Sequence, residues 1–421
     1  MRAMKDSGVE WIGIVPEHWE MRRAKAMFRQ STSKGNDRLV LLSATQDRGV
    51  VDKSTLDSVV QVSEDADLST FKTVHKNDFV ISLRSFQGGF EISHEEGVIS
   101  PAYTVFRLSK QTYPHFYRHL FKSYGFIDKI NSLTVGIREG KNIQYVDFAD
   151  MLLPYIPLAE QQRIAEFLDR KCAEVDEMIA LQEQIIEELK AYKQSVITEA
   201  VTKGLNPAAP MRDSGIEWIG SIPEHWEVHR IKNHFSIISG SGFDVNLQGL
   251  ENGELPICKA SDISRADKVL YAAENYLSRE VALTQKFNII PIGSIIFPKI
   301  GEAMKKNRRA ICAVECCVDN NCQALVPNGI NNIYSYYLLC CIKMEWYDNA
   351  GTIPSISNQK LRIEHIPFPT PTEQQVIADY LDEKCDEIDK LIAIKQQKIE
   401  NLKEYKKSII YEYVTGKKEV E

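Results

Sequence analysis

A fifteen-residue phrase occurs twice in this chain, about two hundred residues apart. DSGVEWIGIVPEHWE runs from Asp6 to Glu20, and DSGIEWIGSIPEHWE runs from Asp213 to Glu227. Two Trp, a Pro, a His and two Gly recur in register, which chance does not produce. The chain therefore contains two copies of one structural unit, and its fold has to accommodate both.

A second repeated segment closes each copy. LLPYIPLAEQQRIAEFLDRKCAEVDEMIALQEQIIEELKAYKQSVI (152–197) matches HIPFPTPTEQQVIADYLDEKCDEIDKLIAIKQQKIENLKEYKKSII (365–410) at a constant offset of 213. The opening phrases are offset by 207, so the middle of the second copy is six residues longer, and the two middles share little identity. Each copy is thus a repeated frame around a dissimilar insert. The stretch NPAAP at 206–210 breaks the helix and links the copies.

Each frame ends in a long predicted helix. Pro157 and Pro371 precede the helices, where a missing N–H costs little, and Thr372 is a candidate N-cap. Glu160 and Glu373 add negative charge to the first turns. Apolar residues then recur at the spacing of a coiled-coil seam over about four heptads. The seam comprises Leu168, Cys172, Val175, Ile179, Ile186, Leu189 and Val196 in the first copy, and Leu381, Cys385, Ile388, Ile392, Ile399, Leu402 and Ile409 in the second.

The two helices can bury their seams against each other. We expect antiparallel pairing about a pseudo-two-fold axis; the alternatives are packing on the helix's own domain or a homodimer. Both seams carry polar exceptions, Gln182 with Lys395 and Lys193 with Lys406, and polar seam residues fix register. A helix of about 40 residues would be roughly 60 Å long.

The two inserts are predicted to be mixed β with few helices. Strands are expected at 39–42, 78–82 and 102–108 in the first insert and at 255–258, 293–297 and 310–314 in the second, with short helices at 114–129 and 332–347. The fold class is therefore α+β, with two mixed-β domains separated by two long antiparallel coiled-coil helices. The expected bounds are 1–156 and 204–370 for the domains, and 157–203 and 371–421 for the helices.

Net charge is −7, but the acidity lies on the predicted helices. Acids outnumber bases 10 to 5 in Glu160–Thr202 and 10 to 7 in Glu373–Thr415, which leaves about +1 for the rest of the chain. Polar and basic loops follow the central strands of both inserts, at 81–89 and 296–309, and similar turns lie at 136–142 and 353–360. Such side chains can read base edges and grip phosphates. The alternative is a set of solvated surface turns.

Motifs for chemistry are lacking. The sequence has no GxxxxGK[ST] phosphate loop, no Asn-Pro-Pro-aromatic methyltransferase motif and no evident nuclease pattern, so no catalytic residue is assigned. His18 and His225 are expected to be structural, beside Trp19 and Trp226. The nine Cys lack paired CxxC spacing, so we expect reduced thiols and no metal, with a metal site as the alternative. No long apolar run or signal peptide is recognised, and a cytoplasmic location is expected.

The repeated residues resemble a known family. EWIG-x-[IV]-PEHWE, a variable stretch, then EQQ-x-IA-x-[FY]-LD-x-KC, each present twice, closely resembles the DNA specificity subunit of type I restriction–modification systems over nearly the whole chain. The resemblance implies two target-recognition domains, each reading one half of a bipartite asymmetric site in double-stranded DNA. It implies a helix pair that sets the spacer and docks two methyltransferase subunits, which recruit two motor-nuclease subunits. The chain itself would be non-catalytic; S-adenosylmethionine, ATP and Mg²⁺, and hence DNA methylation, would belong to the partners.

Candidate DNA contacts follow from the loops and the resemblance together. In the first insert they are Arg84, Gln87, Arg138, Lys141 and Asn142, and in the second they are Lys299, Lys305, Lys306, Arg308, Asn358 and Lys360. The near-neutral inserts imply few phosphate contacts, so we expect the isolated chain to bind DNA poorly. The alternative function is a stand-alone DNA-binding or adaptor protein of the same fold, without a restriction complex.

Overall fold

The computed structural model describes residues 2–34, 39–56, 68–82, 89–133, 143–242, 245–349 and 351–420. The chain forms two compact units, residues 1–183 with 396–421 and residues 184–395. Two long helices, α4 (Leu158–Lys203) and α11 (Pro371–Val414), each contribute one half to either unit. The first unit therefore joins two segments that are distant in sequence, whereas the second unit is contiguous.

The repeated frame forms the same strand pairs in both units. In the first unit β1 (Met4–Asp6) pairs with β2 (Ile14–Pro16), and β3 (Glu20–Arg23) pairs with β12 (Leu152–Tyr155). The equivalent pairs in the second unit are β13 (Met211–Asp213) with β14 (Ser221–Pro223) and β15 (Glu227–Arg230) with β24 (His365–Phe368). All four pairs are antiparallel. The end of each opening phrase thus lies beside the strand that leads into a long helix.

The first insert is built on an antiparallel four-stranded sheet in the order β4-β11-β8-β9. Its strands are β4 (Phe28–Ser31), β11 (Thr104–Leu108), β8 (Phe79–Ile81) and β9 (Phe90–Ile92). Two further pairs are β5 (Leu42–Thr45) with β6 (Gly49–Asp52), and β7 (Lys72–Val74) with β10 (Gly97–Ile99). The helices of this insert are α1 (Pro114–Lys122), α2 (Tyr124–Leu133) and α3 (Tyr145–Asp150).

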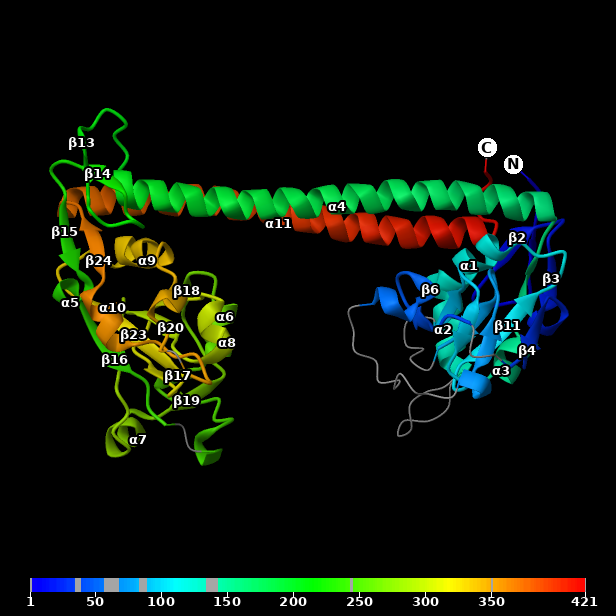
Figure 1. Cartoon of the computed structure of the whole chain (residues 1–421), viewed down its shortest axis with the longest axis horizontal. Coiled ribbons are helices and arrows are strands. Elements are labelled where there is room, and N and C mark those ends of the chain that lie inside the picture. Colours follow the sequence, from blue (N-terminus) through cyan, green and yellow to red (C-terminus); the bar gives the residue numbers. More distant parts are fainter. Residues whose placement is uncertain are drawn as a thin grey trace. The chain divides into compact units, whose positions relative to one another are not determined.

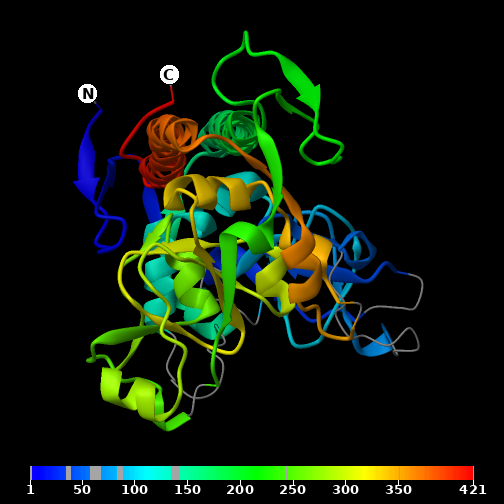
Figure 2. The ribbon, with the colours of Figure 1, turned by 90° about the vertical axis from the view of Figure 1, so that its left-hand side faces the viewer.

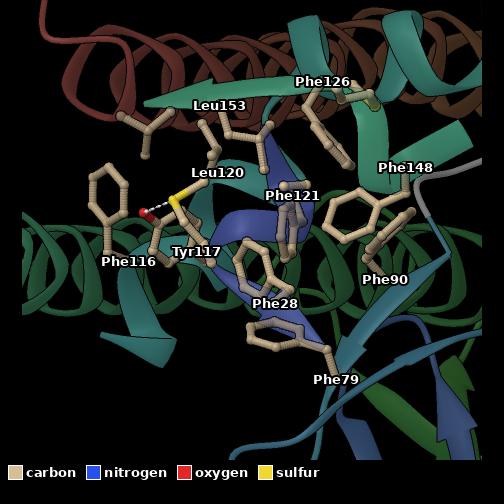
Figure 3. Close-up of a cluster of buried hydrophobic side chains, with 14 of the residues drawn as sticks. Phe28, Phe79, Phe90, Phe116, Tyr117, Leu120, Phe121, Phe126, Phe148 and Leu153 are labelled. Atoms are coloured by element: carbon tan, nitrogen blue, oxygen red, sulfur yellow. Dashed lines mark hydrogen bonds between the residues drawn. The ribbon is translucent and has the colours of Figure 1, made fainter. Parts of the chain in front are cut away.

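Aromatic side chains fill the core of the first unit (Figure 3). Phe28 and Phe79 from the sheet meet Phe121 from α1 and Phe148 from α3, with ring centroids 5.2–6.4 Å apart. Edge-to-face pairs, such as Phe28 with Phe79 and Phe79 with Phe121, stabilise a core beyond the area they bury. The Tyr117 hydroxyl donates to the Pro154 carbonyl at 3.0 Å and so joins this core to the frame.

The second insert has a larger sheet of five strands in the order β16-β23-β20-β21-β18. These strands are β16 (Phe235–Ser239), β23 (Cys322–Pro327), β20 (Ile295–Pro298), β21 (Ala310–Cys312) and β18 (Val269–Leu270), and only β18 pairs in parallel. A three-stranded sheet adds β19 (Asn275–Leu277), β17 (Leu255–Cys258) and β22 (Cys317–Val318). Its helices are α5 (Ile231–His234), α6 (Ala260–Arg265), α7 (Arg279–Thr284), α8 (Gly301–Lys305), α9 (Asn332–Cys340) and α10 (Asn358–Ile363).

The long helices lie side by side in both views (Figures 1 and 2). In the first unit the ring centroids of Phe167 and Tyr413 lie 4.5 Å apart and Asp176 contacts Lys406, so the residue number falls along α11 as it rises along α4. The pairing is therefore antiparallel, as predicted. The predicted N-cap Thr372 is wrong: the cap of α11 is Thr370, whose hydroxyl accepts from the Glu373 N–H at 3.4 Å, while the Glu373 carboxylate accepts from the Thr370 N–H at 3.1 Å. This reciprocal contact is a capping box.

The predicted fold class is confirmed: each unit combines a mixed-β insert with halves of two long helices. Some element bounds differ from those expected. The strand expected at 39–42 begins only at Leu42, and the helix expected at 114–129 is interrupted at Ser123, whose backbone is extended. In the described part of the chain, no helix is both long and apolar enough to cross a membrane.

Candidate functional site

Each repeated phrase holds the first turn of a long helix through a His-Trp pair. His18 Nε2 lies 2.8 Å from one oxygen of Glu160, and the Trp19 indole N–H donates to the other at 3.1 Å. In the second copy His225 and Trp226 contact Glu373 at 2.8 and 3.0 Å. The contacts agree with the expectation that both His residues are structural.

The carboxylate of Glu373 has a strongly altered pKa. Partial burial by itself would raise it, but hydrogen bonds from Trp226, Thr370 and His225 lower the pKa to about 2. Because the donors stabilise the charged form, Glu373 stays ionised well below neutral pH. The negative charge also lies at the helix N-terminus, where the backbone N–H groups favour it.

The same Trp residues pack against the ends of the opposite helices. A Cβ atom on Gly204, just beyond α4, would lie 3.1 Å from the Trp226 ring, and one on Gly416, beyond α11, would lie 2.8 Å from Trp19. Both glycines have φ near +70°, a conformation that favours glycine at a helix C-terminus. Each phrase therefore holds the start of one long helix and the end of the other.

Within each unit, an equivalent ion pair joins α4 to α11. Lys406 Nζ lies 2.6 Å from Asp176 in the first unit, and Lys193 Nζ lies 2.5 Å from Asp389 in the second. Of the ten aliphatic positions predicted as the central seam, six are buried: Leu168, Val175, Ile186, Leu381, Ile388 and Ile399. The other four, Ile179, Leu189, Ile392 and Leu402, are half-buried. The polar seam residues Lys193 and Lys406 reach carboxylates on the partner helix.

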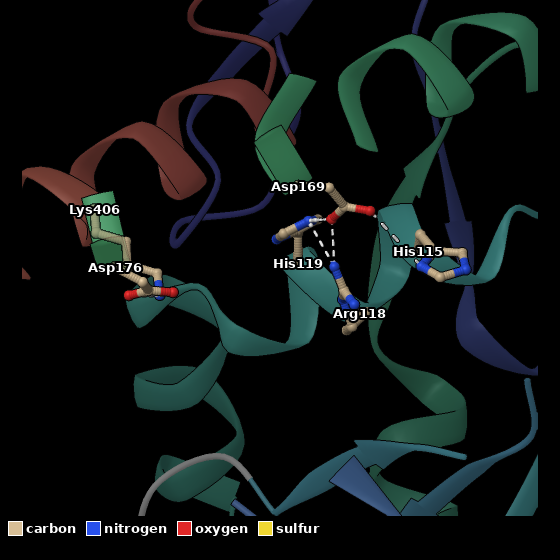
Figure 4. Close-up of polar contacts among 6 residues, drawn as sticks. All are labelled: His115, Arg118, His119, Asp169, Asp176 and Lys406. Atoms are coloured by element: carbon tan, nitrogen blue, oxygen red, sulfur yellow. Dashed lines mark hydrogen bonds and ion pairs between the residues drawn. The ribbon is translucent and has the colours of Figure 1, made fainter. Parts of the chain in front are cut away.

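Asp169 of α4 forms a polar cluster with the first insert (Figure 4). It accepts from Arg118 and contacts His119 Nε2, both on α1, and His115 lies 3.8 Å away. Burial lowers the pKa of His119; for Asp169, burial opposes ionisation, but the His119 hydrogen bond and the Arg118 charge lower its pKa. None of these four residues was among the predicted site residues.

The equivalent aspartate in the second copy is held by different residues. Asp382, at the same offset of 213, accepts from the Tyr337 hydroxyl at 2.8 Å and from the Lys268 ammonium. In both units the insert contacts its long helix through the same frame aspartate. The side chains that bind this aspartate differ between the two inserts. In the sequence, only the repetition of Asp169 at Asp382 could have indicated that this aspartate has a role in both copies.

The second insert brings together two of the predicted polar loops. Ile300, directly after β20, forms a β-bridge with Ser355, and the Ile356 N–H donates to the Lys299 carbonyl at 3.0 Å. Lys299 therefore lies at the base of the turn that leads to Asn358 and Lys360. Asn358 Oδ1 is buried with no partner among the described residues, and Lys360 Nζ donates to the Asp348 carbonyl at 2.8 Å.

The remaining candidates of the second insert lie on and after α8. Lys305, Lys306 and Arg308 are exposed, and Lys305 forms an ion pair with Glu302 at 2.6 Å. The five candidates of the first insert (Arg84, Gln87, Arg138, Lys141 and Asn142) lie outside the described residues. All eleven assignments stay predictions.

Five of the seven cysteines of the second insert are buried, and Cys340 and Cys341 are half-buried. Cys312 Sγ lies 3.4 Å from Cys316 Sγ, and both side chains are at most 1% exposed. All nine cysteines are free. Among the residues that the structure describes, no group of three His, Cys, Asp or Glu side chains could hold a metal ion.

Comparison with known proteins identifies the relatives of this arrangement. Residues 223–404 match the family model described as type I restriction modification DNA specificity domain. A putative type I restriction enzyme MjaX specificity subunit from Methanocaldococcus jannaschii is 21% identical over 96% of this chain and 95% of its own length. The chain is a homologue of the type I DNA specificity subunits. The relatives are named for specificity and not for a catalytic activity, in agreement with the expectation that no catalytic residue lies on this chain.

Further comparisons extend this result to the fold. The specificity-subunit homologue is 33% identical to the EcoKI specificity subunit of Escherichia coli, over 35% of this chain and 28% of that protein. A chain from a study of complex assembly and conformational transition of the type I R-M system superposes with a TM-score of 0.74, at 16% identity, covering 95% of this chain and 98% of that one. The HsdS subunit from Thermoanaerobacter tengcongensis superposes with a TM-score of 0.53, at 16% identity, over 96% and 98%.

Proposed function

We propose that each insert of this chain reads one half of a bipartite, asymmetric DNA sequence. The observation that carries the proposal is the combination of equal frames with unlike inserts. The frames repeat the His-Trp-Glu contact residue for residue, whereas the inserts differ in their main sheets, of four strands in one and five in the other. A protein that recognised one sequence twice would have no need of two different inserts.

Two methyltransferase subunits would dock on the helix pair. The long helices expose large apolar side chains at matching positions: Met178 with Leu391, at 47% and 46% exposure, Leu181 with Ile394, and Tyr192 with Tyr405. Exposed apolar residues that cluster on a surface mark interaction sites. Because the positions repeat in both copies, they suit two copies of the same partner.

The helix pair would also set the spacer between the two half-sites. At 1.5 Å per residue, a helix of 46 residues such as α4 is about 69 Å long. Half-sites one turn of B-DNA apart are separated by about 34 Å. A continuous helix is stiff on this scale, and its length is set by the number of residues.

The chemistry would belong to the partners. S-adenosylmethionine would bind the methyltransferase subunits, ATP and Mg²⁺ would serve two motor-nuclease subunits recruited through them, and the assembly would work in the cytoplasm. This chain would supply sequence recognition alone. Binding two half-sites through one tethered molecule raises the effective concentration of the second, so neither insert needs high affinity by itself.

The test is to map methylated adenines in DNA exposed to the chain assembled with type I methyltransferase subunits. We expect methylation within a two-part motif with a fixed spacer. Failure of the chain to co-purify with a methyltransferase would favour a stand-alone DNA-binding or adaptor protein. Methylation of a single continuous motif would contradict the two-reader proposal.

A further inference from the structure

The segment between α8 and β21 alternates exposed and inward-facing side chains. Lys306 and Arg308, two of the predicted DNA contacts, are exposed. Asn307 between them is half-buried, and Arg309 is only 4% exposed. The two inward-facing residues make side-chain contacts that fix the backbone on either side of Arg308.

Asn307 joins the segment to the turn that follows α9. Its Nδ2 donates to the Ile342 carbonyl at 3.2 Å, and its Oδ1 accepts from the Met344 N–H at 3.1 Å. Asn307 has φ of 53°, in the left-handed region that asparagine adopts more readily than most residues other than glycine. The amide nitrogen and the amide oxygen of Asn307 therefore both stabilise a backbone conformation that few other residue types adopt.

Arg309 strengthens the same connection from the other side. Its Nη2 donates to the carbonyls of Asn307 and Ile342, both at 3.2 Å. The Ile342 carbonyl thus accepts from both inward-facing residues. Nε and Nη1 of Arg309 have no hydrogen-bond partner among the described residues. Burial of a charge with unmet donors is costly, so core stability alone does not explain an arginine here.

We propose that Asn307 and Arg309 are positioning residues that hold Lys306 and Arg308 in the orientation needed to read the second half-site. The inference rests on the proposed function and adds residues that determine its specificity without touching DNA. A loop that is ordered before binding loses less conformational entropy when DNA binds. It also restricts which base edges the two cations can reach.

The test uses the assembled complex and measures methylation rates on duplexes that carry single-base changes in either half of the mapped site. Asn307→Gly keeps the left-handed backbone and removes both side-chain bonds, and Arg309→Met keeps the apolar stem. We expect each variant to lower discrimination at one or more positions of the second half by about fivefold or more, the lower range for one base contact. Discrimination in the first half should stay unchanged.

The matched control is Asn206→Gly in the linker, where the asparagine side chain accepts from the Ala208 N–H at 3.0 Å. This variant loses a comparable hydrogen bond, and base discrimination in both half-sites should stay unchanged. If Asn307→Gly unfolds the second unit, Asn307→Asp, which keeps the acceptor for Met344, takes its place. A double-mutant cycle separates positioning from folding, because Asn307→Gly should have little further effect once Lys306 and Arg308 are both alanine.

Two outcomes would overturn the inference in different ways. If the wild-type complex reads two half-sites and both variants leave the second half unchanged, the positioning role is wrong and the proposed function stands. If the wild-type complex reads only one continuous motif, the proposed function fails and the positioning role fails with it.

Discussion

The Trp226 ring packs against Gly204, the residue just after α4, while its indole N–H donates to Glu373 at the start of α11. Trp19 makes the same two contacts with Gly416 and Glu160 in the other unit. One side chain thus fixes an N-terminus and a C-terminus of neighbouring antiparallel helices. This requirement accounts for the presence of the phrase in both copies.

The glycine contact predicts a difference between substitutions with equal backbone strain. Gly215→Ala, at φ of 72° with no atom within 4 Å of the added Cβ, should destabilise by about 1–2 kcal/mol through its left-handed backbone alone. Gly416→Ala, whose Cβ would lie 2.5 Å from Pro16 and 2.8 Å from Trp19, should lose about 1–3 kcal/mol more from overpacking. Urea unfolding of the two variants measures this; equal losses would show that the contacts with Pro16 and Trp19 add nothing to the cost.

The lowered pKa of Glu373 predicts a pH dependence of stability. Because its pKa in the folded chain, about 2, is below the ordinary value of 4.5, the carboxylate stabilises the fold above pH 4.5, and this contribution is lost as the pH falls toward 2. The difference in melting temperature between wild type and Glu373→Gln should therefore be largest above pH 4.5 and shrink toward pH 2. Glu224→Gln, in an exposed position of the same phrase, should follow the wild type throughout. A difference that is constant with pH would contradict the charge argument.

The two inserts should read separate half-sites. Arg84→Ala should relax recognition only in the first half and Lys299→Ala only in the second, each by about 1–3 kcal/mol at one position. Methylation-site mapping with each variant complex provides the measurement. Disturbance of the first half by Lys299→Ala, together with no effect of Arg84→Ala, would show that these assignments are wrong.

The length of the helices should determine the spacer. Four residues inserted in the middle of α4 add about 6 Å, which corresponds to roughly two base pairs at 3.4 Å each. The mapped motif should then contain a longer gap between unchanged halves. Four residues inserted in the 206–210 linker are the control and should leave the gap as it was. An unchanged gap in the α4 variant would count against the helix pair as the ruler.

The isolated chain should bind DNA weakly at physiological salt. Outside the acidic helix segments its charge is only about +1, and phosphate contacts dominate affinity for DNA. A gel shift with the mapped duplex should show tight binding only after methyltransferase subunits are added. Tight, sequence-selective binding by the chain alone would refute this expectation.

The frame was predictable because it obeys regular rules. A constant offset of 213 and a heptad pattern led to two antiparallel helices, observed at Leu158–Lys203 and Pro371–Val414. The meaning of the polar seam residues was only partly accessible: Lys193 and Lys406 each pair with an aspartate of the opposite helix, which required knowledge of the helix register.

The inserts were less predictable because they depend on non-local contacts. The continuous helical pattern over 114–129 gives no sign that Ser123 would turn extended and direct its hydroxyl to the Leu120 carbonyl. His119 could not be assigned to Asp169 because the insert does not repeat, and its counterpart is Tyr337. The bridge between Ile300 and Ser355 likewise joins loops more than fifty residues apart.

The division of α4 and α11 between the units has a consequence for biosynthesis. The core that surrounds Trp19 includes Ile410 and Val414, which leave the ribosome some four hundred residues after the phrase they pack against. The first unit therefore cannot close while it is being translated, although domains commonly fold in the order of synthesis. The second unit is contiguous in sequence and is expected to fold first. Residues 1–183 complete their fold only after residues 396–421 have been synthesised.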